Sequence, residues 1–187
     1  MKFAELLQRR RQLSLPGYKT LADVGFDGDN WISPYQTISN SKTGPVLVAY
    51  NWLDAPSVLQ HRQILAKLGY LPGIPFNQVM DLALEYAGLS RPDIYVTQAF
   101  HLLPTTRSEG IPQRYVDYSF EHVTRHEIEN RKVIALGTAA MAACRRHGVK
   151  ATEVCHPSSR TGSYQDRAKV IGDALKDANK VYIKVTL

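Results

Sequence analysis

The chain has 187 residues, 44% of them hydrophobic, which is long enough to bury one core as a single domain without disulfides or metals. Its net charge of +6 favours contact with polyanions, although many basic proteins never meet nucleic acid. Cys144 and Cys155 lack a metal-ligand spacing and no apolar run reaches about 18 residues, so we expect no structural zinc, no membrane span and no secretion.

The first half of the chain predicts one helix, a turn-rich stretch, a strand and a second helix. Residues 2–13 have the spacing of a short amphipathic helix, and residues 14–43 are rich in turn formers. The apolar run 46–50 is typical of a buried parallel strand. Ser57 is expected to cap the helix that follows. The buried stripe of that helix is predicted to comprise Val58, Leu59, Ile64, Leu65 and Leu68.

The second half continues the alternation of helices and strands. Further strands are predicted at 94–97, 133–137 and 152–155, and a half-exposed last strand at 180–187. Helices are predicted at 76–87, 115–130, 138–147 and 164–178, that at 115–130 being a charged surface helix. Alternating strands and helices predict an α/β fold of three layers, α/β/α, with a short, mainly parallel central sheet.

Ligand sites in such sheets lie beyond the carboxyl ends of the strands. The rule directs attention to Asn51, Gln98, Gly137 and His156, which are each expected to follow a strand. Two other groups are interpreted as solvated surface. They are the basic clusters Arg9 to Arg11 and Arg145 with Arg146, and the histidines His101, His122, His126 and His147.

Several segments, in order along the chain, resemble motifs of the uracil-DNA glycosylase superfamily. Residues 48–52, Val-Ala-Tyr-Asn-Trp, are similar to its G-Q-D-P-Y or G-I-N-P-G motif, and residues 73–79 to its G-x-P-F-V-G stretch. Residues 94–104 resemble its V-Y-I-T-N strand and proline-ended loop, and residues 155–159 its H-P-S motif. A packing element at 131–140 also resembles the family. The resemblance covers about 45–174, so residues 1–43 are an N-terminal extension of one domain, 1–187.

This resemblance implies a DNA glycosylase that hydrolyses the N-glycosidic bond of uracil, or of a modified or mismatched pyrimidine, after the base flips out of DNA. It implies an intracellular monomer, cytoplasmic or nucleoid-associated, with DNA as partner, no membrane, no cofactor and no metal. Asn51 would hold the attacking water and His156 would stabilise the departing base. Base-binding roles fall to Tyr50, Phe76 and Gln98, and DNA-backbone roles to Ser158, Ser159 and Arg160.

The chemistry of these residue types leaves alternatives open. An amide such as that of Asn51 is no general base, so it only orients water, and Asp54 is a substitute base if the loop bends it inward. Gln98 has one methylene more than the family's asparagine, which leaves room for a modified pyrimidine. The second hypothesis is a catalytically weak or inactive DNA-binding accessory protein. A third is a small-molecule glycosidase or nucleotide-binding protein on a similar sheet.

Overall fold

Four parallel strands form the centre of the protein. The structure is a computed structural model that describes residues 2–183, with side chains up to residue 180. The strands are β1 (Val46–Asn51), β2 (Tyr95–Phe100), β3 (Val133–Leu136) and β4 (Ala151–Val154). Their order in the sheet is β2-β1-β3-β4 and each neighbouring pair is parallel. The carboxyl ends of the strands therefore meet at one edge of the sheet.

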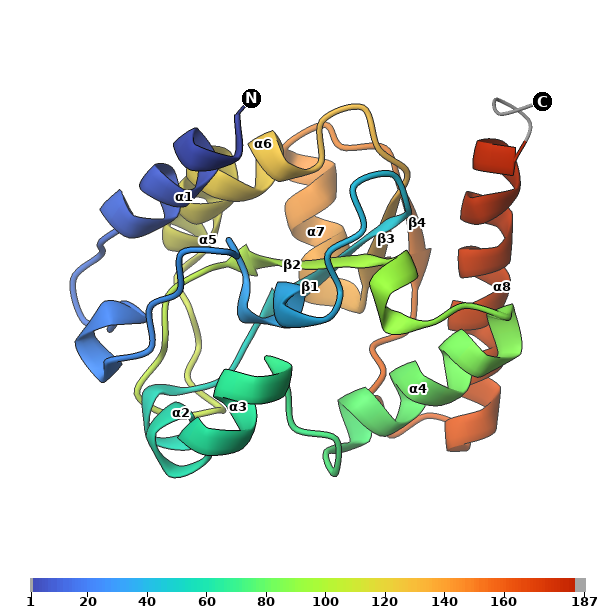
Figure 1. The fold of residues 1–187 in the computed structure, drawn as a ribbon, viewed down its shortest axis with the longest axis horizontal. Helices are drawn as coiled ribbons and strands as arrows, with labels where there is room; N and C mark the ends of the chain where they lie inside the picture. Colours follow the sequence, from blue (N-terminus) through green and yellow to red (C-terminus); the bar gives the residue numbers. More distant parts are fainter. Residues whose placement is uncertain (1, 184–187) are drawn as a thin grey trace.

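Helices cover both faces of this sheet (Figure 1). On one face lie α4 (Pro75–Ala87) and α8 (Tyr164–Ile183), which pack against each other and against the sheet. The other face is covered by α5 (Gln113–Ser119) and α7 (Thr138–Arg146), with α1 (Phe3–Gln12) outside them. The predicted three-layer α/β/α fold with a parallel sheet is confirmed.

The alternation of side chains along β1 divides the core into two clusters. Leu47 and Ala49 face the cluster of α4 and α8, whereas Val46 and Val48 face the cluster of α5 and α7. All four side chains are buried, because helices cover both faces. Short 3₁₀ turns lie between the main elements: η1 (Ala22–Val24), η2 (Pro34–Thr37) and η3 (Arg91–Asp93).

The helix predicted after the first strand is two helices, α2 (Ala55–Gln60) and α3 (Arg62–Leu68). Its cap is Asp54 and not Ser57, because the Asp54 carboxylate accepts the Ser57 N–H at 3.0 Å. The break at His61 changes the helical register. Leu59 and Ile64, predicted to be buried, are consequently 52% and 39% exposed.

The predicted surface helix at 115–130 is also interrupted and turns one side inward. After α5 the chain forms a π-helical turn, Phe120–Thr124, and the short α6 (Arg125–Glu127). The extra residue of a π turn rotates the following side chains, and Glu127 is fully buried as a result. His101, predicted to be solvated, lies beside it and is also buried, because α5 and the π-helical turn pack over the end of β2.

The prediction of a last strand at 180–187 is wrong as far as the structure reaches. Helix α8 continues to Ile183, since its alternating residues extend a helix already packed on α4, and residues 184–187 lie outside the described part of the chain. The second strand also differs from its prediction. It runs on to Phe100, so Gln98 lies within β2 and not beyond its end.

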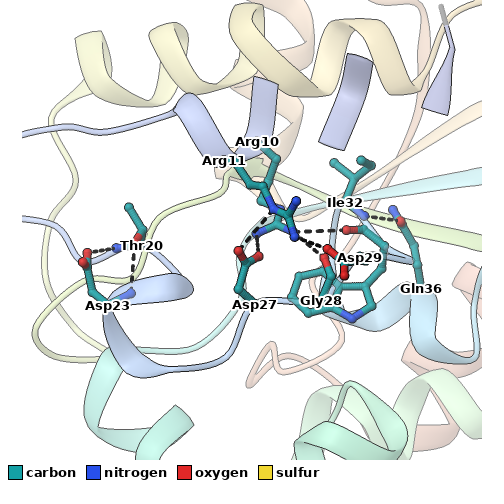
Figure 2. Close-up of polar contacts among 10 residues, drawn as sticks. Arg10, Arg11, Thr20, Asp23, Asp27, Gly28, Asp29, Ile32 and Gln36 are labelled. Atoms are coloured by element: carbon teal, nitrogen blue, oxygen red, sulfur yellow. Dashed lines mark hydrogen bonds and ion pairs between the residues drawn. The ribbon is translucent and has the colours of Figure 1, made fainter. Parts of the chain in front are cut away.

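The arginines of α1 are not simply an exposed face (Figure 2). Arg10 is 6% exposed, forms an ion pair with Asp27 and donates to the Gly28 carbonyl at 2.9 Å. Arg11 pairs with Asp27 at 3.2 Å and with Asp29. The carboxylates of Asp27 and Asp29 thus offset much of the positive charge of this cluster. The ion pairs also hold α1 against the loop that contains these two aspartates.

Candidate active site

A cavity of about 220 Å³ opens at the carboxyl edge of the sheet. Its polar lining consists of Asn51, Asp54, Arg107, His156 and Ser158, and its apolar and aromatic lining of Tyr35, Trp52, Leu53, Ile74 and Phe76. Drug-sized ligands occupy pockets of about 300–1,000 Å³, so a hollow of this size suits a group smaller than those ligands.

Asn51 and Asp54 reach the cavity from the end of β1. Asn51 is the last residue of the strand and is half-buried, and the chain then turns into α2. Asp54 is 7% exposed, and its Oδ1 accepts the Ser57 N–H at 3.0 Å as the cap of α2. The turn is fixed from outside by the Ala55 N–H, which donates to the carbonyl of Pro104 at 3.0 Å. Asp54 therefore places a carboxylate in the same hollow as the Asn51 amide.

His156 follows β4 and enters the cavity from its other side. Partial burial lowers the pKa of its imidazole, so the neutral form prevails at neutral pH. Its Nδ1 accepts the backbone N–H of Ser158 at 3.1 Å. A neutral imidazole whose Nδ1 accepts a hydrogen bond carries its proton on Nε2. His156 is thus prepared as a neutral hydrogen-bond donor.

Aromatic rings form the wall next to His156. Phe76, in the first turn of α4, has its ring centroid 5.5 Å from that of His156 and 5.9 Å from that of Tyr35. Tyr35 packs in turn on Tyr70, with centroids 6.5 Å apart. Burial raises the pKa of Tyr35 to about 12, so this wall carries no charge at neutral pH. The wall beside the imidazole is therefore aromatic and uncharged.

The remaining sequence-predicted site residues do not line the cavity. Tyr50 packs against the cluster on the other face of the sheet from Asn51. Gln98 pairs with Ala49 in register and is 1% exposed, and its Nε2 has no hydrogen-bond partner among residues 2–183. Ser159 and the exposed Arg160 belong to the loop after His156, where the Ser159 Oγ accepts the Thr161 N–H at 3.2 Å. The structure therefore brings together four of the predicted residues around the cavity: Asn51, Phe76, His156 and Ser158. The other four, Tyr50, Gln98, Ser159 and Arg160, lie outside its lining.

Two residues of the cavity lining, Tyr35 and Arg107, could not be recognised as site residues from the sequence. Tyr35 lies in η2, within the N-terminal extension that carries no recognisable motif. Arg107 lies in the polar loop after β2, where a single arginine resembles any solvated loop residue. The sequence allows Asp54 as a substitute base if the loop bends it inward, and the turn into α2 places Asp54 in the lining of the cavity.

Gly137 permits the close approach of the loop that carries His156. Its φ of +85° and ψ of 166° fall in a region that essentially only glycine adopts. A Cβ at this position would lie 2.7 Å from the Cβ of His156. The first residue after β3 therefore fixes how deeply the histidine sits.

We expect Gly137→Ala to lower the free energy of unfolding by about 1–3 kcal/mol through backbone strain, with the contact to His156 adding to that loss. Gly148→Ala is the matched control, because Gly148 has a φ of +64° and open space around its Cβ position. It should cost only about 1–2 kcal/mol. Urea denaturation of both variants measures the difference, and equal losses would contradict the close packing of Gly137 on His156.

No model of a known protein family matches the chain, and a search of curated proteins finds no match to it. None of the helices within residues 2–183 has the length and apolarity needed to cross a membrane. In that same part of the chain, no three His, Cys, Asp or Glu side chains are grouped so that they could hold a metal ion.

Proposed function

We propose that the protein is a DNA glycosylase that hydrolyses the N-glycosidic bond of uracil or of a modified pyrimidine flipped out of DNA. The observation that carries this proposal is the cavity itself. An amide, a neutral imidazole and an aromatic ring, from Asn51, His156 and Phe76, line one hollow the size of a small planar group. The hollow lies at the carboxyl edge of a parallel sheet, where such folds place their ligands. The resemblance of the strand-end motifs to the uracil-DNA glycosylase superfamily supports the same proposal.

Cleavage of an N-glycosidic bond leaves negative charge on the base and positive charge on the sugar. A hydrogen-bond donor aimed at the base carbonyl stabilises the leaving anion. His156 meets this need without transferring a proton, because its neutral ring holds the proton on Nε2. Its Nδ1 stays fixed on the Ser158 N–H, so the ring needs no rearrangement during the reaction.

Water is the nucleophile in this proposal. Asn51 orients the water through its amide, and the Asp54 carboxylate accepts a proton from it. The water oxygen bonds to C1′ of the deoxyribose as the bond from C1′ to the base nitrogen breaks. The electron pair of that bond leaves with the base, which later takes up a proton. The products are an abasic sugar and the free base.

DNA is the proposed partner because the base must leave the helix to reach the cavity. Unstacking costs a few kcal/mol, and stacking on an aromatic ring recovers about 1–3 kcal/mol. Phe76 provides that ring, with Tyr35 behind it. Arg107 and Ser158 lie at the cavity, and Arg160 is exposed in the neighbouring loop. These groups are suited to contact the phosphates on either side of the flipped nucleotide.

Incubation with labelled oligonucleotides tests the proposal. The substrates carry uracil, a thymine mismatch or a 5-substituted uracil, in single and double strands, and hot alkali reveals abasic sites on a gel. We expect abasic product from at least one substrate and none from unmodified DNA. DNA affinity should fall steeply with salt, which distinguishes the protein from a small-molecule glycosidase. Salt-dependent binding without product from any substrate would favour the accessory protein instead.

Asp54→Asn tests the assignment of the base within this reaction. Asparagine caps helices as well as aspartate does, so the Ser57 N–H keeps its acceptor and the fold should be retained. We expect the single-turnover rate to fall by about 10²-fold, because a general base contributes at least that much. Melting temperature and DNA affinity serve as controls and should stay unchanged. An unaltered rate would contradict the role of Asp54 as general base and leave Asn51 as the residue that orients the water.

A further inference from the structure

The loop after His156 is held in one conformation by its own hydrogen bonds. The Ser159 N–H donates to the His156 carbonyl at 2.8 Å, and the Ser158 N–H donates to the His156 ring. The Thr161 N–H donates to the Ser159 Oγ at 3.2 Å. These bonds form a tight turn in which the orientation of the imidazole depends on the path of the backbone.

Arg167 of α8 holds this turn from inside the protein. Its Nε donates to the Pro157 carbonyl at 3.0 Å. Its Nη1 donates to the carbonyls of Gly162, at 2.7 Å, and Thr161, at 3.2 Å. One planar guanidinium therefore fixes both ends of the loop 157–162, which a point charge such as an ammonium group cannot do with the same geometry.

The environment of Arg167 shows that its charge is not part of an ordinary ion pair. The residue is 5% exposed, and no carboxylate between residues 2 and 180 lies within ion-pair distance of it, although the charge of the neighbouring Asp166 acts on it. Its guanidinium lies 4.9 Å from the ring centroid of Tyr164. Loop carbonyls thus supply the compensation that a buried cation requires, so the charge and the loop path depend on each other.

We propose that Arg167 is a positioning residue for His156, which keeps the Ser158 N–H on Nδ1 and thereby keeps the imidazole proton on Nε2. Arg167 fixes the Pro157 and Thr161 carbonyls on either side of Ser158. Without it, the peptide of Ser158 turns away and both imidazole tautomers become populated. The effect of Arg167 on catalysis rests on the proposed glycosylase function, whereas its effect on the tautomer of His156 does not.

Nitrogen-15 NMR of the histidine rings tests this proposal directly. The chain has six histidines, and loss of one set of signals in His156→Gln assigns the ring of interest. In the wild-type protein we expect one tautomer, protonated on Nε2. In Arg167→Gln the Nδ1 and Nε2 shifts should move toward each other, as a mixture of tautomers requires. Arg167→Lys keeps the charge but not the planar guanidinium, so its Nδ1 and Nε2 shifts should lie between those of the wild-type protein and those of Arg167→Gln.

Activity supplies the second readout. We expect kcat to fall by about 10²-fold in Arg167→Gln with KM little changed, because small misplacement of a catalytic group has an effect of that size. Arg145→Gln is the matched control. Arg145 is an exposed arginine paired with Glu153 of β4 and makes no contact with the loop, so its loss should change neither readout.

The outcomes separate the two proposals. A folded Arg167→Gln protein with the wild-type tautomer overturns the positioning role, whatever its activity. If the wild-type protein forms no abasic product while the tautomer shifts in the variant, the glycosylase function fails and the positioning role stands. Should Arg167→Gln not fold, Arg167→Lys provides the same test, and a wild-type tautomer there overturns the role.

Discussion

Replacing His156 by alanine is expected to lower the rate of base excision by about 10²–10³-fold. Losing one preorganised donor to a developing anion has an effect of this size. Burial keeps the imidazole neutral, and the Ser158 N–H holds its Nδ1, so the donor is present before the substrate arrives. Single-turnover kinetics on the best substrate of the wild-type protein measure the chemical step without product release.

Two variants sharpen the test of His156. His156→Gln retains an N–H donor on a flexible side chain and should recover part of the lost rate. His122→Ala is the control, because His122 lies in the π-helical turn on the opposite face of the sheet, stacked on Tyr118. A wild-type rate in His156→Ala would remove this residue from the mechanism, and an equal loss in His122→Ala would indicate general destabilisation.

Glu127→Ala is expected to lower the free energy of unfolding by about 3–5 kcal/mol, the usual loss when one partner of a buried charged network is removed. The Glu127 carboxylate is fully buried and accepts from Thr97 Oγ1 at 2.5 Å, Tyr95 OH at 2.7 Å and Gln36 Nε2 at 3.1 Å. His101 Nε2 lies 3.4 Å away. Each of these polar groups would lose an acceptor inside the core.

The contribution of Glu127 to the free energy of unfolding should depend on pH. Burial alone would raise the pKa of this carboxyl, but the hydrogen bond and charge of His101, with the hydroxyls of Thr97 and Tyr95, outweigh it and lower the pKa. A carboxyl whose pKa is lower in the folded state stabilises the fold above its unfolded pKa of about 4.3 and loses that contribution as pH falls through the folded value. The difference between wild type and Glu127→Gln should therefore shrink in acid.

Urea denaturation at several pH values measures both effects. Glu121→Ala is the matched control, since Glu121 is 56% exposed and pairs with Arg125 and with His147, and an exposed pair is worth at most about 1 kcal/mol. Equal losses in the two variants would show that the Glu127 network contributes no more than a surface pair. The network also connects to the cavity, because Gln36 belongs to the same 3₁₀ turn as Tyr35.

The sequence predicted those parts of the fold in which local pattern and tertiary environment agree. The apolar run from Val46 forms a strand buried on both faces, and α4 ends where Gly88 adopts a φ of +68°. Its predictions failed where packing changed the register. Leu59 and Ile64 suit a helical stripe, but the break at His61 exposes them.

The candidate site follows the same division. Asn51 and His156 could be predicted to lie at one edge of the sheet, since parallel strands end together. Gln98 could not be placed, because β2 continues two residues beyond it and its side chain stays inside the core. Tyr50 shares a strand with Asn51 but alternates to the other face.

By itself, the sequence determined the alternation of strands and helices, the parallel sheet and the strand ends where polar residues gather. These features follow from the spacing of hydrophobic residues and from turn-forming residues, both of which are local properties of the sequence. Only the tertiary structure decided which distant side chains meet: Tyr35 and Arg107 at the cavity, Arg167 beneath the loop of His156, and Glu127 among donors from separate segments. Such contacts depend on how helices pack across the sheet, and no short stretch of sequence encodes that geometry.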